Sequence, residues 1–160
     1  MSNLEKIPVT ILTGFLGAGK TTLIRNLIIK NKSKRLAVII NEFGDLGVDG
    51  EIVKQCSDET CPEENILELA NGCICCTVAD DFVPTMQTLL DGKYLPEHIL
   101  IETSGLALPK PLLKAFEWPE IRSKLTVDSV LAVVDAEAVV NGVFAPVSYT
   151  HLTLPTILLV

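Results

Sequence analysis

No apolar run in this sequence is long enough to cross a membrane. Its uninterrupted apolar stretches, such as Leu36–Ile40, are far shorter than the roughly 20 residues that a transmembrane helix requires. The amino-terminal region also lacks an export signal, which would combine a basic segment, a long apolar stretch and a small-residue cleavage site. We therefore expect a cytoplasmic protein that does not bind membranes.

The sequence also lacks an excess of positive charge. Lys and Arg number 13 against 20 Asp and Glu, which gives a net charge of −7. A protein with this balance has no long-range attraction for nucleic acid, although one local site is still able to bind an anion. Disorder is excluded as well, because 48% of the residues are apolar and 21% are charged, and 160 residues suit one domain.

Internal repeats are absent, and the chain instead alternates between segments typical of strands and of helices. Short apolar runs predict strands at residues 7–13, 36–40, 66–69, 98–103 and 127–134. Apolar residues at helical spacing predict helices at 21–30 and 80–90, and residues 109–124 are amphipathic but interrupted by Pro111 and Pro119. Apolar strands between helices favour an α/β fold with a mostly parallel sheet and helices on both faces.

The segment Gly14–Thr21 matches the pattern G-x-x-x-x-G-K-T and lies between an expected strand and an expected helix. Glycines allow such a loop to turn its backbone N–H groups inward, and the following helix points its positive dipole at the same place. In loops of this kind the lysine contacts β- and γ-phosphate oxygens and the hydroxyl ligates Mg²⁺. We therefore predict a P-loop NTPase. The expected phosphate-binding residues are Gly14, Gly17, Ala18, Gly19, Lys20, Thr21 and Thr22.

A second part of the nucleotide site is expected after the strand at residues 98–103. This strand delivers Glu102 at its carboxyl end, where ligands of open α/β sheets collect. Glu102 is predicted to hold a Mg²⁺-bound water or to orient the attacking water, so that Lys20 and Glu102 are the predicted catalytic residues. Gly105 would let its backbone N–H approach the γ-phosphate. A strand that merely ends in glutamate is the alternative.

Three of the five cysteines, Cys73, Cys75 and Cys76, lie within four residues. Thiolates prefer soft or borderline metals, so this turn favours Zn²⁺, Co²⁺ or Cu⁺ over Mg²⁺ or Ca²⁺. A closed structural zinc site normally has a second pair of ligands, whereas three thiols leave an exchangeable position that suits a carrier. Cys56 and Cys61 are candidates for a fourth ligand. Redox-sensitive or merely buried thiols are the alternative to metal binding.

Residues 41–50 form a glycine-rich polar segment that carries Glu42, Asp45 and Asp49. Loops of this composition order around a γ-phosphate and Mg²⁺ and relax after hydrolysis. The alternative is a solvated acidic loop. His98 begins a strand and is expected to be structural rather than a metal ligand.

The carboxyl-terminal residues do not continue the pattern. Residues 146–160 have no helix caps, little charge and no expected partner for a further strand–helix unit. Residues 147–155 also match one translated frame of a common transposon-end sequencing adapter. We therefore expect a partial P-loop NTPase domain, C-terminally truncated, at residues 1–146 and a non-native, adapter-derived tail at 147–160. An ordinary β-hairpin or edge strand is the alternative.

The motifs GFLGAGKTT, NEFGDLGVDG, NGCICC, ADDF and IETSGLALP stand in this order in the sequence. Together they resemble the CobW family of GTPases over residues 7–145. The resemblance implies a GTP-hydrolysing metallochaperone whose CxCC thiols bind cobalt, or zinc in a zinc-directed member, and pass it towards cobaltochelatase in cobalamin biosynthesis. Carried over by position, the Co²⁺ or Zn²⁺ ligands are Cys73, Cys75 and Cys76, and the Mg²⁺ ligands are Thr21, Glu42 and Glu102.

Two parts of that family are missing from the sequence. The guanine-reading (Asn/Thr)-Lys-x-Asp loop and the histidine-bearing C-terminal domain do not occur, so the choice of GTP over ATP follows from the resemblance alone. Two other functions stay open. One is a nucleotide-binding metal store or regulator with negligible turnover, and the other is an ATP-using small-molecule kinase that has no need for thiols.

Overall fold

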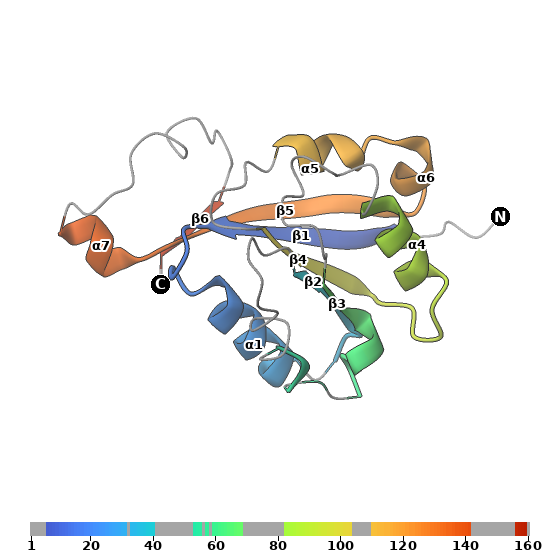
Figure 1. Ribbon diagram of the computed structural model, residues 1–160, viewed down its shortest axis with the longest axis horizontal. Coiled ribbons are helices and arrows are strands. Elements are labelled where there is room, and N and C mark those ends of the chain that lie inside the picture. Colours follow the sequence, from blue (N-terminus) through green and yellow to red (C-terminus); the bar gives the residue numbers. More distant parts are fainter. Residues whose placement is uncertain are drawn as a thin grey trace.

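One parallel β-sheet organises the chain (Figure 1). The computed structural model describes residues 6–31, 33–40, 53–55, 57, 59–68, 82–103, 110–141 and 156–159. Within them, a six-stranded sheet has the order β3-β2-β4-β1-β5-β6, and every neighbouring pair is parallel. The strands are β1 (Ile7–Gly14), β2 (Leu36–Ile40), β3 (Ile66–Glu68), β4 (His98–Glu102), β5 (Leu125–Val134) and β6 (Thr156–Leu159). The predicted α/β fold with a parallel sheet is confirmed.

Helices connect the strands, as parallel pairing requires. Those with described bounds are α1 (Lys20–Lys30), the 3₁₀ helix η1 (Glu63–Asn65), α4 (Val83–Leu90), α5 (Lys110–Ala115), α6 (Pro119–Arg122) and α7 (Ala136–Val140). Across the described part of the chain, none of them combines the length and the apolar character that a bilayer crossing demands.

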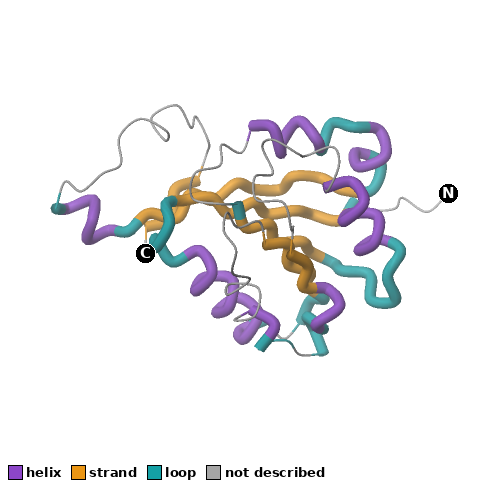
Figure 2. The backbone as a smooth tube through the Cα atoms, in the orientation of Figure 1, coloured by secondary structure: helices purple, strands orange, loops and turns teal. Residues whose placement is uncertain are grey.

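The helices cover both faces of the sheet, as the sequence predicts. On one face α1 packs through Ile24 and Ile28 into an apolar cluster that also contains Leu12 of β1. On the other face α4, α5 and α6 contribute to a second cluster that contains Ile11 of the same strand. Neighbouring strand residues enter different clusters because their side chains point to opposite faces. Figure 2 shows α1 on one side of the strands and the helices of the second cluster on the other.

Proline does not interrupt α5 where the sequence pattern suggested. The helix begins at Lys110, so Pro111 stands in its first turn, where a missing N–H costs no intrahelical hydrogen bond. The expected interruption at Pro111 is therefore wrong. Pro119 instead opens α6 as its first residue, after Trp118 in an extended conformation.

The expectation that the carboxyl-terminal segment has no pairing partner is also wrong. Residues Thr156–Leu159 form β6, which pairs in parallel with Leu131–Val134 of β5. Backbone groups make such a ladder, so an extended segment of apolar and β-branched residues is sufficient to form it. The adapter origin of residues 147–160 stays a prediction.

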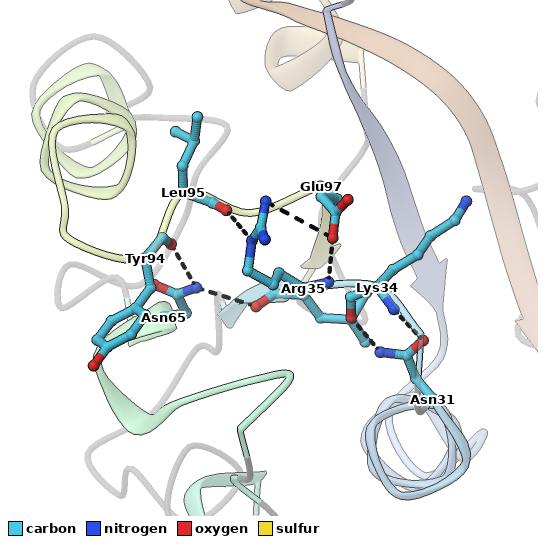
Figure 3. A network of polar contacts seen from close by, with 8 residues as sticks. Asn31, Lys34, Arg35, Asn65, Tyr94, Leu95 and Glu97 are labelled. Atoms are coloured by element: carbon cyan, nitrogen blue, oxygen red, sulfur yellow. Dashed lines mark hydrogen bonds and ion pairs between the residues drawn. The ribbon is translucent and has the colours of Figure 1, made fainter.

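A network of polar contacts fixes the edge of the sheet at which the strands begin (Figure 3). Asn65, which is buried, donates from its amide group to the carbonyls of Leu36 at 3.3 Å and Tyr94 at 3.0 Å. Arg35 donates from its backbone N–H to the Glu97 carboxylate at 3.0 Å, and its guanidinium Nε donates to a nearby carbonyl at 2.9 Å. These contacts join η1 to the starts of β2 and β4.

At the opposite edge, β2, β3 and β4 end at one level, and the neighbouring strand β1 continues two residues further, to Gly14. Ile40 of β2 is paired both with Glu68 of β3 and with Glu102 of β4, and Glu102 is paired with Leu12 of β1. Because the strands are parallel, the chain leaves all of them at the same edge. The segments that follow residues 14, 40, 68 and 102 therefore start from one edge of the sheet.

Candidate functional site

The loop after β1 has a backbone that requires glycine. Gly14 has a φ of 145°, and a Cβ atom there would overlap the carbonyl oxygen of Val133 on β5. Gly19 has a φ of 95° and a ψ of 17°, a left-handed conformation that side chains disfavour. The loop therefore packs directly onto β5 at its start and turns sharply into α1 at its end.

Among the described residues, no side chain caps the amino terminus of α1. Gly19 occupies the N-cap position and provides no side-chain hydrogen bond, and the first turn contains no acidic residue. Helix N-terminal N–H groups carry partial positive charge and need acceptors. An anion placed in the loop would supply those acceptors, so this helix terminus suits a phosphate group.

Lys20, the first residue of α1, directs its ammonium group back over the loop. Its Nζ atom donates to the carbonyl oxygen of Phe15 at 3.0 Å and lies 4.0 Å from Oε1 of Glu102. The side chains of Lys20 and Glu102 are each only 6% exposed. The cation is thus held between the loop backbone and one carboxylate, which places a buried positive charge at the phosphate-binding loop.

Thr21 joins the loop to β4. Its hydroxyl group donates to Glu102, at 3.0 Å from Oε1 and 3.2 Å from Oε2. The structure therefore brings together Lys20, Thr21 and Glu102, as the sequence predicted from two separate motifs. A hydroxyl oxygen beside a carboxylate is a hard-oxygen donor set, and this chemistry fits Mg²⁺.

Thr103 was not identified from the sequence, although it directly follows Glu102. Its backbone N–H and its hydroxyl both donate to the carbonyl oxygen of Leu12, at 2.9 and 3.1 Å. Thr13 on β1 is equally buried, but its hydroxyl has no hydrogen-bond partner among the described residues. No local sequence signal distinguishes these two threonines, because the contact spans 91 positions.

Several predicted site residues lie outside the described part of the chain. The phosphate-loop residues are placed around the start of α1, and Thr22 is exposed on that helix. The predicted residues that belong to segments the structure does not describe are Glu42, Asp45, Asp49, Cys56, Cys73, Cys75, Cys76 and Gly105. Among the described residues, no group of three or more His, Cys, Asp or Glu side chains is placed to hold a metal ion.

Cys61, a candidate fourth ligand, is described and is fully buried in the apolar cluster beneath α1. The backbone of the residue before it, Thr60, accepts a hydrogen bond from Leu36 at 2.7 Å, which places it beside the start of β2. The chain enters the cysteine turn from the other end of the sheet, after Glu68. This placement favours a packing role for Cys61.

His98, the first residue of β4, contacts a polar side chain of the neighbouring strand β1, which suits the structural role expected for it. Its Nε2 atom lies 2.9 Å from the Thr10 hydroxyl, which is also 2.9 Å from the Ser129 hydroxyl. Burial lowers the pKa of His98 below its ordinary value; Asp128 opposes this shift and Lys34 adds to it. The imidazole is therefore biased towards its neutral form.

Comparison with known proteins places most of the chain in one sequence family. The family model for the CobW/HypB/UreG nucleotide-binding domain matches residues 8–153. A zinc chaperone CobW from a Sinorhizobium species is 63% identical over 144 residues, which cover 90% of this chain and 41% of that protein. A zinc chaperone CobW from Pseudomonas aeruginosa is 58% identical over 148 residues, covering 91% and 40%.

A solved structure has the same fold. The crystal structure of the Zn(II)-bound YjiA GTPase from Escherichia coli matches with a TM-score of 0.57 and 28% identity, over 85% of this chain and 42% of that one. This chain therefore spans about two fifths of the length of the proteins that it matches.

Proposed function

Because this chain belongs to the CobW/HypB/UreG family of nucleotide-binding domains, we propose that it is the GTP-hydrolysing part of a metallochaperone. The observation that carries the proposal is the joint placement of Lys20, Thr21 and Glu102 at an uncapped helix N-terminus. Its relatives include chaperones named for zinc and a GTPase solved with zinc.

The residues of the loop have separate tasks in binding the triphosphate. The uncapped N–H groups at the start of α1 bind phosphate oxygens, and Lys20 neutralises the charge on the β- and γ-phosphates. Lys20 needs little movement for this, because the Phe15 carbonyl already holds its ammonium group over the loop. When the triphosphate binds, the Lys20 ammonium group would exchange its hydrogen bond to the Phe15 carbonyl for contacts with phosphate oxygens.

Thr21 and Glu102 are the described residues that would hold Mg²⁺, and Glu42 is the further ligand that we propose. When bound, Mg²⁺ neutralises charge on the phosphate oxygens during hydrolysis. Glu102 would also orient the attacking water. Because Glu102 is only 4% exposed, its carboxylate keeps one position relative to Thr21. The Gly105 N–H is proposed to approach the γ-phosphate.

The proposed cargo metal is bound by the thiols of Cys73, Cys75 and Cys76. Thiolates bind Zn²⁺ more tightly than Co²⁺ in the Irving–Williams order, so zinc is the cargo favoured by the ligands and by the names of the relatives. Cobalt delivery to cobaltochelatase is the alternative cargo and recipient. Titration of the chain with Zn²⁺ and Co²⁺ in competition distinguishes the two. A Cys75→Ser, Cys76→Ser double variant should lose binding, and Cys61→Ala is the control.

Nucleotide and metal are proposed to influence each other through the loops at one edge of the sheet. The acidic segment starts after Ile40 and the cysteine turn follows β3, and both strands end level with Glu102. GTP with Mg²⁺ would order residues 41–50 and thereby position the cysteine turn. The coupling is reciprocal, so bound metal should tighten nucleotide binding by the same factor.

Phosphate release from GTP and from ATP tests the enzymatic part of this proposal. We expect Mg²⁺-dependent release that prefers GTP and that Lys20→Ala reduces about a hundredfold. Lys30→Ala is the matched control, because Lys30 is an exposed lysine at the opposite end of the same helix. The absence of any Lys20-dependent release would contradict the proposal and favour a nucleotide-binding metal store with negligible turnover. Equal metal content and activity without the thiols would favour a small-molecule kinase.

A further inference from the structure

Two buried threonines stand at the ends of the neighbouring strands β1 and β4. Leu12 is paired with Glu102, so Thr13 is the next residue on β1 and Thr103 directly follows the last residue of β4. Both side chains are 0% exposed. They have the same size and the same exposure, and differ in their hydrogen bonds.

Thr103 makes two contacts with a single acceptor. Its backbone N–H lies 2.9 Å from the Leu12 carbonyl oxygen, and its hydroxyl lies 3.1 Å from the same atom. The hydroxyl of Thr13 makes no hydrogen bond within the described part of the chain. Any residue other than proline preserves the backbone contact of Thr103, whereas only a hydroxyl residue preserves the second one.

The double contact lies between the two halves of the nucleotide site. Thr103 directly follows Glu102, and Leu12 precedes Gly14, the start of the phosphate loop, by two residues. A rotation at the end of β4 would carry the Glu102 carboxylate away from Thr21, which it now meets at 3.0 Å. The Thr103 hydroxyl opposes that rotation because it adds a second bond at the point where β4 ends.

We propose that Thr103 is a positioning residue of the nucleotide site. Its hydroxyl, bound to the Leu12 carbonyl, fixes the distance between the Glu102 carboxylate and the phosphate loop, and so sets the affinity for Mg²⁺ in the presence of nucleotide. Direct hydrogen-bond partners of a metal ligand change metal affinity by about ten- to a hundredfold, and because Thr103 acts on Glu102 through the backbone, we expect the lower end of that range. The inference rests on the proposed function, because it assigns Thr103 a role in the same Mg²⁺-triphosphate site.

Three single variants of the chain test the inference. Binding of a fluorescent GTP analogue is measured at increasing Mg²⁺ concentrations for Thr103→Val, Thr103→Ser and Thr13→Val. We expect Thr103→Val to raise the Mg²⁺ concentration at half-saturation about tenfold. Thr103→Ser, which keeps the hydroxyl, should restore the original requirement to within about twofold. Thr13→Val removes a hydroxyl that bonds no described residue, and it should also leave the requirement within about twofold. An equal rise for both valine variants would overturn the proposal, because it would indicate altered packing.

A measurement without nucleotide separates this inference from the proposed function. Hydrogen exchange of the Thr103 backbone N–H, which donates to Leu12, reports directly on the end of β4. Exchange at this position should be faster in Thr103→Val than in the original chain, and unchanged in Thr13→Val and Thr103→Ser. Unchanged exchange in Thr103→Val would overturn the inference. Failure of the original chain to bind GTP with Mg²⁺ would instead contradict the proposed function.

Discussion

The hydroxyl group of Thr21 lies within hydrogen-bond distance of both carboxylate oxygens of Glu102, a residue 81 positions away in the sequence. One proton thus bridges two acceptors and ties the phosphate loop to β4. The Lys20 ammonium lies 4.0 Å from the same carboxylate. Glu102 is therefore the acceptor around which the cationic and hydroxyl groups of the loop are arranged.

Replacing the Glu102 carboxylate with an amide keeps the shape of the side chain but should abolish most of the proposed phosphate release. Glu102→Gln removes the negative charge that Mg²⁺ and the attacking water require, so phosphate release should fall about a hundredfold. The control is Glu97→Gln, since Glu97 precedes the same strand at its opposite end and pairs with the exposed Arg35. Glu102→Gln with full activity would show that the carboxylate does not take part.

Gly14 and Gly17 should differ in their tolerance of alanine. Both have positive φ values, 145° and 80°, but only at Gly14 would an added Cβ meet backbone, at the Val133 carbonyl. Gly17→Ala should cost about 1–2 kcal/mol of unfolding free energy from the left-handed backbone alone. Gly14→Ala should cost more, because β5 must also shift. Urea unfolding of the two variants gives this order, and the reverse order would contradict the packing of the loop onto β5.

The buried amide of Asn65 should contribute more to stability than the exposed amide of Asn31 (Figure 3). Asn65→Ala leaves the carbonyls of Leu36 and Tyr94 without this donor, and we expect a loss of about 1–3 kcal/mol in unfolding free energy. Asn31→Ala removes contacts with Lys34 that solvent replaces, with an expected change of about 0.5 kcal/mol. Equal losses in denaturant unfolding would exclude a special role for the buried amide.

Lowering the pH should reduce the unfolding free energy of the chain, partly through His98. Burial lowers the pKa of this imidazole below 6.5, its ordinary value, although the Asp128 carboxylate opposes the shift; Lys34 adds to it. The unfolded chain therefore binds a proton at higher pH than the folded chain does, and the stabilising contribution is present above pH 6.5 and is lost as the pH falls through the folded pKa. Unfolding free energy measured between about pH 7.5 and about pH 5.5 should fall more for the original chain than for His98→Gln. Parallel curves would contradict this assignment.

The strands and the phosphate loop could be predicted because their signals are local. Apolar runs such as Leu36–Ile40 mark buried parallel strands, and the glycine spacing around Lys20 marks a loop whose backbone must turn. The predicted strand at residues 127–134 leaves out the first two residues of β5, because Thr126 is polar and exposed. Pro111 was misjudged, since its effect depends on whether it stands in the first turn of a helix.

The contacts that complete the site could not be predicted in the same way. The carbonyl of Leu12 accepts from Thr103, and the carbonyl of Val133 crowds Gly14, but backbone atoms carry no sequence signal of their partners. The pairing of Thr156–Leu159 with β5 is likewise made by backbone groups. The positions of Cys73, Cys75 and Cys76 belong to a segment that the structure does not describe, so their role as ligands stays a prediction.

The strands β2, β3 and β4 end at the same level, and this limits how binding at one loop can affect binding at another. Each of these strands is held to its neighbours by a continuous ladder, so that none slides without breaking several hydrogen bonds at once. If nucleotide and metal are coupled as proposed, the paired strands are a poor route for that coupling, and the segments that follow the strands are the better one. Substitutions in the two apolar clusters should therefore change the thermal stability of the domain without changing the proposed coupling between nucleotide binding and metal binding.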